Sequence, residues 1–131
     1  MLEIDDIHRK LTPNFKLAEF LHEGNTQGLT SVILQNLWAT AKMLEIVRQI
    51  VGNRPIHIDS GFRTPEHNKE VGGVADSQHL YGKAADIKVQ GMTPPEVQHE
   101  LRFWAGGMGC YNEWTHLDIL TTPPKRRWSG P

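Results

Sequence analysis

Hydrophobic residues follow a helical spacing in the first half of the chain. Between residues 29 and 51 they recur at steps of three or four, which places them on one side of an α-helix. They are Ile33, Leu37, Ala41, Leu44, Val47 and Val51. Gly52 and Asn53 come next and are typical of a helix C-terminus. The pattern therefore predicts one long core helix over 29–51.

Three shorter helices are predicted from apolar residues and capping signals. The segment 14–22 carries several large apolar residues and is expected to form the first. Thr64, followed by proline, is typical of an N-cap and predicts a helix over 64–71. Thr93 opens a capping box that also contains proline, which predicts a helix over 93–104.

Strands are expected between and after these helices. Residues 56–59 alternate apolar and polar side chains after a proline, and residues 84–89 form a second apolar segment. Two more short strands are predicted over 108–111 and 114–120. The order of elements indicates an α+β fold in which helices pack on a small, largely antiparallel sheet.

Length and composition narrow the class of protein. The 131 residues suit a single domain, with a core over about 11–120 and a polar, loosely held tail over 121–131. The net charge of −1 argues against a nucleic-acid-binding surface. Cys110 is the one cysteine, which excludes an internal disulfide and a zinc site built on cysteines. We attach no role to it.

The N-terminal sequence MLEIDDIHRK is charged and precedes no long apolar segment. It does not have the form of a signal peptide, and no part of the chain is apolar enough to cross a membrane. We therefore expect a cytoplasmic product that reaches its site of action by another route.

Candidate metal ligands lie in two segments. His79 and Asp86 are separated by a glycine turn that can bring their side chains together, and His116 lies in the last predicted strand. Two histidines and one carboxylate suit a catalytic zinc site with an open position for water, although the same ligands do not exclude other divalent metals. Glu113, three residues before His116, is a candidate general base. In a regular strand the two would face opposite sides, so an inward Glu113 requires an irregularity there.

Arg63 lies in the loop after residues 56–59, where its guanidinium could bind a substrate carboxylate or a developing oxyanion. Each of these candidates has a plainer alternative. Arg63 could only clamp its own loop, Glu113 could be a solvated residue at a strand end, and the two histidines could be ordinary buried side chains. The basic sequence 125–128 (KRRW) is predicted to be part of a solvated tail.

Residues 77–86 resemble the S-x-H-x-x-G-x-A-x-D signature of the D-alanyl-D-alanine metallopeptidases, the M15 family, at every fixed position. Three other segments are similar to segments of the same family. They are 60–65 (SGFRTP), 108–111 (MGCY) and 113–116 (EWTH). The segment 11–20 is also similar to this family's N-terminal part. Many relatives have another residue at the position of Glu113.

The resemblance implies a fold of the hedgehog/DD-peptidase type and one zinc ion per chain, held by His79, Asp86 and His116. It also implies that Glu113 is the general base and that Arg63 binds the substrate or the transition state. Two supporting residues near the site follow from it, Ser77 and Asp118. The implied reaction is hydrolysis of a peptide bond next to a D-amino acid in bacterial peptidoglycan.

The sequence does not choose among a carboxypeptidase, an endopeptidase and a dipeptidase. The absence of a signal peptide favours a phage or prophage endolysin that acts on the cell wall after release, and we expect a monomer. The alternative is a zinc-containing binding module, for example a phage structural component that grips cell-wall peptide without turnover. A free carboxylate at Glu113 argues against that alternative.

Overall fold

The computed structural model describes residues 6–131; residues 1–5, which begin the segment examined for a signal peptide, lie outside the described residues. The α-helices are α1 (Ser31–Ile50), α2 (Pro65–Glu70) and α3 (Pro94–Glu100). Short 3-10 helices are η1 (Leu17–Phe20), η2 (His22–Gly24) and η3 (Gln78–Tyr81). The strands are β1 (Lys10–Thr12), β2 (Phe15–Lys16), β3 (Ile56–Ser60), β4 (Ala84–Val89), β5 (Met108–Cys110), β6 (Thr115–Asp118) and β7 (Arg127–Ser129).

The long helix α1 confirms the prediction for residues 29–51. The Thr30 side chain accepts a hydrogen bond from the Ile33 N–H at 3.1 Å, which caps the N-terminus. The helix is followed by Gly52, whose φ of 78° only glycine adopts without strain. Its buried side includes Leu37, Leu44 and Val47, as the spacing predicts.

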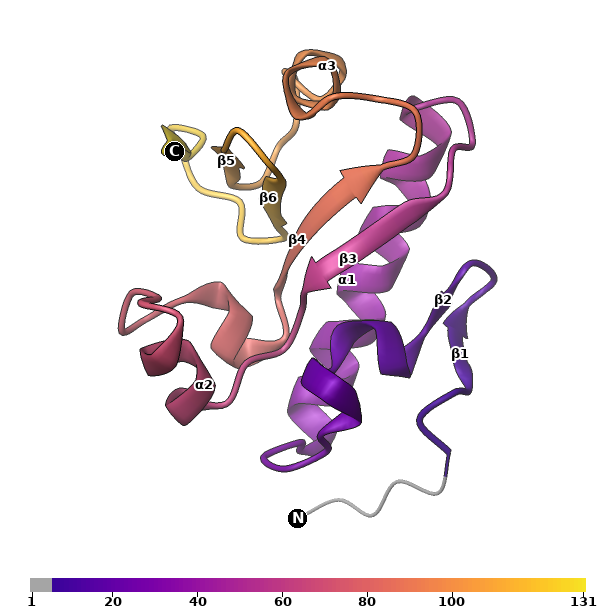
Figure 1. Ribbon diagram of the computed structural model, residues 1–131, viewed down its shortest axis with the longest axis vertical. Helices are drawn as coiled ribbons and strands as arrows, with labels where there is room; N and C mark the ends of the chain where they lie inside the picture. The colour runs from indigo at the N-terminus through magenta and orange to yellow at the C-terminus, as the bar shows by residue number, and fades with distance from the viewer. Residues whose placement is uncertain (1–5) are drawn as a thin grey trace.

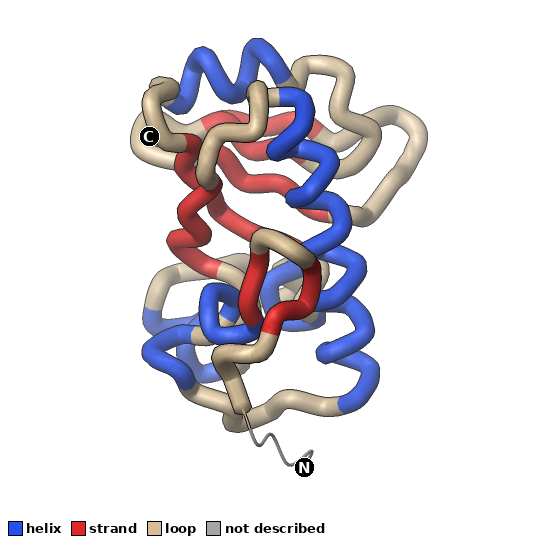
Figure 2. Tube along the Cα trace, turned by 90° about the vertical axis from the view of Figure 1, so that its right-hand side faces the viewer, coloured by secondary structure: helices blue, strands red, loops and turns tan. Residues whose placement is uncertain are grey.

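Five strands form one sheet in the order β3-β4-β6-β5-β7, and β1 pairs with β2 in a separate hairpin. All neighbours in the larger sheet are antiparallel except β5 and β7. Helix α1 runs along one side of this sheet, and α3 lies at the end where β5 and β6 meet (Figures 1 and 2). Apolar side chains of α1, β3, β4 and β6 share one core. The predicted α+β class is confirmed.

Two predictions about local structure are wrong. The segment 14–22 is not a single helix, because Phe15 and Lys16 pair with β1 before two 3-10 turns follow. The tail over 121–131 is not loosely held, because β7 pairs with β5 along Met108 to Cys110. Helix α3 also ends earlier than expected, at Glu100.

Candidate metal centre

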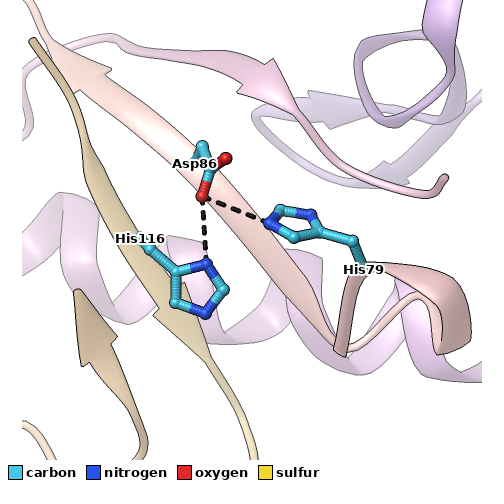
Figure 3. A group of neighbouring side chains, drawn as sticks. All are labelled: His79, Asp86 and His116. Carbon is cyan, nitrogen blue, oxygen red and sulfur yellow. Dashed lines mark hydrogen bonds and ion pairs between the residues drawn. The ribbon is translucent and has the colours of Figure 1, made fainter. Parts of the chain in front are cut away.

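Three side chains from different elements converge on one face of the sheet. His79 comes from η3, Asp86 from β4 and His116 from β6 (Figure 3). One carboxylate oxygen of Asp86, Oδ1, lies 3.2 Å from His79 Nε2 and 3.0 Å from His116 Nδ1. All three residues are buried, and their potential ligand atoms lie within 4.8 Å of one another.

Strand register accounts for the pairing of Asp86 with His116. In the antiparallel pair β4–β6 these two residues are directly opposite each other. Because side chains alternate between the two faces of a sheet, Asp86, His116 and Asp118 share the face that points away from the α1 core. The neighbouring residues Ala85 and Leu117 lie on the core face.

A short turn delivers His79 to the same point. The Ser77 hydroxyl accepts a hydrogen bond from the His79 N–H at 3.2 Å and begins η3. The turn ends at Gly82, whose φ is 71° and whose position would bring a Cβ within 3.1 Å of the Ile33 carbonyl oxygen on α1. The spacing of seven residues between His79 and Asp86 therefore spans one 3-10 turn and the start of β4.

Hydrogen bonds on the far side of each ring determine which nitrogen faces Asp86 with a lone pair. His79 Nδ1–H donates to the Gly61 carbonyl oxygen at 2.7 Å, since a carbonyl can only accept. His116 Nε2–H donates to Asp118 Oδ2 at 2.9 Å. In the neutral rings, His79 Nε2 and His116 Nδ1 are then acceptors that face an acceptor oxygen of Asp86.

Such short distances among acceptors need positive charge in the cluster, which a metal ion between the three ligand atoms supplies. Ligands placed about 2.0–2.2 Å from a tetrahedral zinc ion lie roughly 3.4 Å apart, close to the distances around Asp86 Oδ1. Backbone or carboxylate partners for the outer ring nitrogens are also typical of metal-bound histidines. The residues present therefore fit a zinc ion.

The electrostatics of the cluster favour positive charge between its carboxylates. Burial would raise the pKa of the Asp86 carboxyl, but its contacts with the His116 and His79 rings outweigh burial and lower that pKa. Burial would likewise raise the pKa of Asp118, but its hydrogen bond with His116 lowers it. Burial would lower the pKa of His116, but its contacts with the carboxylates of Asp118 and Asp86 raise it. Both carboxylates are thus ionised and ready to stabilise a cation.

Asp118 holds His116 from behind and is itself fully buried. Its Oδ1 atom accepts hydrogen bonds from the Gly107 N–H at 3.1 Å and the Leu120 N–H at 3.2 Å. The guanidinium of Arg126 also donates to this oxygen. The supporting position expected for Asp118 agrees with these contacts.

Arg63 lies beside the cluster, and its side chain is only 13% exposed. It donates to Ser60 Oγ at 3.1 Å, to Asn68 Oδ1 at 3.3 Å and to Asp86 Oδ2 at 3.3 Å. It therefore clamps its loop and binds a candidate ligand at the same time. With five N–H groups available, it keeps donors for a further anion or carbonyl oxygen.

The structure does not bring Glu113 to the cluster. Glu113 lies exposed at the tip of the β5–β6 hairpin, where the Tyr111 N–H donates to the Trp114 carbonyl oxygen. Glu113 lies in the bend before β6, and together with Thr115 it borders a pocket separate from the cluster. The predicted general-base role of Glu113 has no support in this geometry.

A cleft of about 450 Å³ opens over the cluster. Besides the residues already described, three aromatic side chains line it, Tyr111, Trp114 and Trp128. Sequence reasoning gave none of these a function. Because residues 121–131 were predicted to be a loosely held tail, Trp128 was not considered as a cleft residue. An isolated tryptophan in a polar segment is nevertheless a signal that the segment packs against the domain.

Comparisons with known proteins agree with this site. A model of the family described as Peptidase M15 matches residues 13–118. A zinc D-Ala-D-Ala carboxypeptidase from Streptomyces albus G is 40% identical over 52 residues, which make up 40% of this chain and 20% of that enzyme. The chain thus spans a fifth of the length of that relative. Among the described residues, no helix combines the length and the apolar character needed to span a bilayer.

Proposed function

The chain belongs to the peptidase M15 family, and on that premise we propose that it is a zinc peptidase that cleaves a peptide bond next to a D-amino acid in peptidoglycan. The observation that carries the proposal is the convergence of His79, Asp86 and His116 with their acceptor atoms facing one another. The name of the Streptomyces relative favours removal of a terminal D-Ala from a stem peptide ending in D-Ala-D-Ala.

His79, Asp86 and His116 would be the zinc ligands. When bound, zinc would polarise the scissile carbonyl and lower the pKa of a coordinated water towards neutrality. Gly61 and Asp118 fix the orientation of the two histidine rings from behind. The chain then supplies three ligands and leaves the cleft side open to substrate.

Arg63 has a defined part in this account. Its guanidinium donates a hydrogen bond to Asp86 at the wall of the cleft. Two neutral acceptors, Ser60 and Asn68, also accept hydrogen bonds from the guanidinium and fix its orientation. A fixed, buried cation beside the reacting bond stabilises a carboxylate or a developing oxyanion more strongly than a mobile one. We assign Arg63 to substrate or transition-state binding.

The experiment that tests the proposed function is a digest of purified muropeptides with the zinc-loaded protein, with and without a chelator, read by mass spectrometry. We expect a chelator-sensitive loss of one alanine from stems that end in D-Ala-D-Ala. A split cross-link or stem would identify an endopeptidase instead. Intact muropeptides in the presence of bound zinc would overturn the proposal and favour a binding module.

Two further expectations from the sequence remain proposals about biology. We propose that the protein acts as a monomer and that it serves cell-wall lysis, as a phage-encoded enzyme does. Light scattering coupled to size-exclusion chromatography tests the first. Loss of turbidity of permeabilised bacteria on addition of the protein tests the second, with the His116→Ala variant as the control.

A further inference from the structure

The C-terminal strand β7 covers one side of the cleft although it lies beyond residue 118, where the family match ends. It pairs in parallel with β5, so that Trp128 lies opposite Gly109. A Cβ at Gly109 would stand 2.6 Å from Trp128 Cε2, which means that the indole occupies the space above this glycine. The ring centre of Trp128 is 5.0 Å from that of His116.

Trp128 holds the phenol of Tyr111 through a hydrogen bond of known direction. The indole N–H can only donate, so the Tyr111 hydroxyl oxygen is the acceptor, at 2.9 Å. The O–H of Tyr111 is left for another acceptor. Among the hydrogen bonds of residues 6–131, none uses that O–H as a donor.

Two other contacts fix the ring of Tyr111. The indole of Trp114 stacks on it, with ring centres 4.5 Å apart and an interplanar angle of 13°. Directly after β7, a Cβ at Gly130 would lie 2.7 Å from Tyr111 Cε1, so the backbone there closes over the ring. The phenol is therefore held from several directions at the wall of the cleft.

Arg63 and Tyr111 line the same cleft as the candidate zinc ligands. A hydrogen-bond donor that is fixed before substrate arrives stabilises developing negative charge without a cost of reorganisation. Arg63 and Tyr111 would then both serve the reacting carbonyl.

We propose that Tyr111 is a catalytic residue whose O–H donates to the scissile carbonyl oxygen as it gains negative charge, and that Trp128 is the positioning residue that aims this O–H. The inference rests on the proposed function and names two further parts of that site. It also makes β7 a functional part of the domain.

The test combines kinetics on a tripeptide ending in D-Ala-D-Ala with a double-mutant cycle. Tyr111→Phe should lower kcat by about 100-fold with little change in KM, the loss typical of one oxyanion donor. Trp128→Phe should lower kcat by about tenfold. In the Tyr111→Phe background it should add less than about twofold, because Trp128 acts through Tyr111. Zinc affinity should not change in any of these variants.

Tyr81→Phe and Trp38→Phe are the matched controls, because both side chains are exposed and lie outside the cleft. They should keep wild-type kinetics. Tyr81→Phe also leaves Tyr111 as the only tyrosine of the chain. In that background, the resonance of ¹³Cζ-labelled tyrosine reports Tyr111 alone and should shift when a phosphinate analogue of D-Ala-D-Ala is added to the zinc-loaded protein.

Several outcomes would overturn the inference. One is an active wild-type protein in which Tyr111→Phe keeps its kcat or changes KM alone. Another is an additive double mutant, which would give Trp128 only a general structural role. A wild-type protein that neither cleaves the tripeptide nor shows the tyrosine shift would overturn the proposed function together with this inference. Cleavage without a tyrosine shift would overturn the inference alone.

Discussion

The two faces of β4 and β6 differ in chemistry although they are built from alternating residues of the same strands. On one face Ala85, Ile87 and Leu117 pack into the core beside α1. On the other, Asp86, His116 and Asp118 place ionisable groups where they are almost shielded from water. Burial of apolar groups stabilises the fold, whereas burial of charged groups costs stability unless each group has a partner.

The polar face meets this cost by pairing nearly every group. The outer nitrogens of both histidines have hydrogen-bond acceptors, and Asp118 accepts from two backbone N–H groups and Arg126. Only the cluster around Asp86 Oδ1 brings acceptors together without a donor, and that is where we assign zinc. The comparison teaches that strand alternation separates the residues that stabilise the fold from those that carry out chemistry.

The largest effect is expected from a change on the core face. Leu117 is fully buried, so Leu117→Ala should lower the free energy of unfolding by about 2–5 kcal/mol. Because the side chain points away from His116, the folded fraction should still bind zinc with wild-type affinity. Denaturant unfolding and zinc titration on the same sample check both parts. A folded variant with weakened zinc binding would break the separation of the two faces.

Asp118→Asn should act on zinc affinity. The substitution keeps the volume but removes the carboxylate that orients His116, and changes of this kind typically weaken metal binding by about 10–100-fold. Competition with a chromophoric chelator measures the change. Unaltered affinity would mean that Asp118 only packs against the ring.

Glu113→Gln distinguishes the sequence prediction from the structure. With Glu113 at the exposed tip of the hairpin, turnover should fall by less than about twofold, whereas loss of a general base costs about 10²–10⁴-fold. Steady-state kinetics on a D-Ala-D-Ala peptide distinguishes between these two losses of turnover. A loss in that larger range would establish Glu113 as the base and require the hairpin to rearrange when substrate binds.

The smallest effect concerns Glu45, a partly exposed carboxylate far from the cleft. Burial would raise its pKa, but hydrogen bonds from Asn14 lower it. A carboxyl with a lowered pKa in the folded state stabilises the protein above its unfolded pKa of about 4.3, and this contribution is lost as the pH falls through the folded value. Glu45→Gln should therefore cost about 0.5 kcal/mol at pH 7.

Denaturant unfolding of both proteins at pH 7 and pH 3 measures this effect. The difference between wild type and Glu45→Gln should shrink as the pH is lowered from 7 to 3, because the carboxylate takes up a proton. A difference that persists unchanged at pH 3 would mean that packing against Asn14, and not charge, stabilises this contact.

Local signals were sufficient to locate the three α-helices. The N-caps at Thr30, Thr64 and Thr93 all accept hydrogen bonds from the third residue of the helix that follows. These signals work because the capping residue and its partner are close in sequence. The earlier end of α3 and the 3-10 turns in place of a helix over 14–22 reflect tertiary contacts that no local pattern records.

The candidate site could be predicted only in part. The motif from Ser77 to Asp86 identified its first half, but the pairing of Asp86 with His116 depends on a register between strands 30 residues apart. Strand β7 has three residues and a single apolar side chain, which is too short a pattern for its pairing with β5 to be predicted from the sequence. Glu113 lies in the bend before β6, where strand alternation does not orient its side chain, and it borders a pocket separate from the cluster that His116 joins.

The measurement that tests the central claim most directly is the zinc content of the purified protein after equilibrium dialysis, for wild type and His116→Ala, with circular dichroism to show that both are folded. The account predicts one zinc ion per chain for the wild type and none for His116→Ala, with loss of D-Ala-D-Ala cleavage in parallel. A folded His116→Ala protein that retains one zinc ion per chain and cleaves the peptide would contradict it.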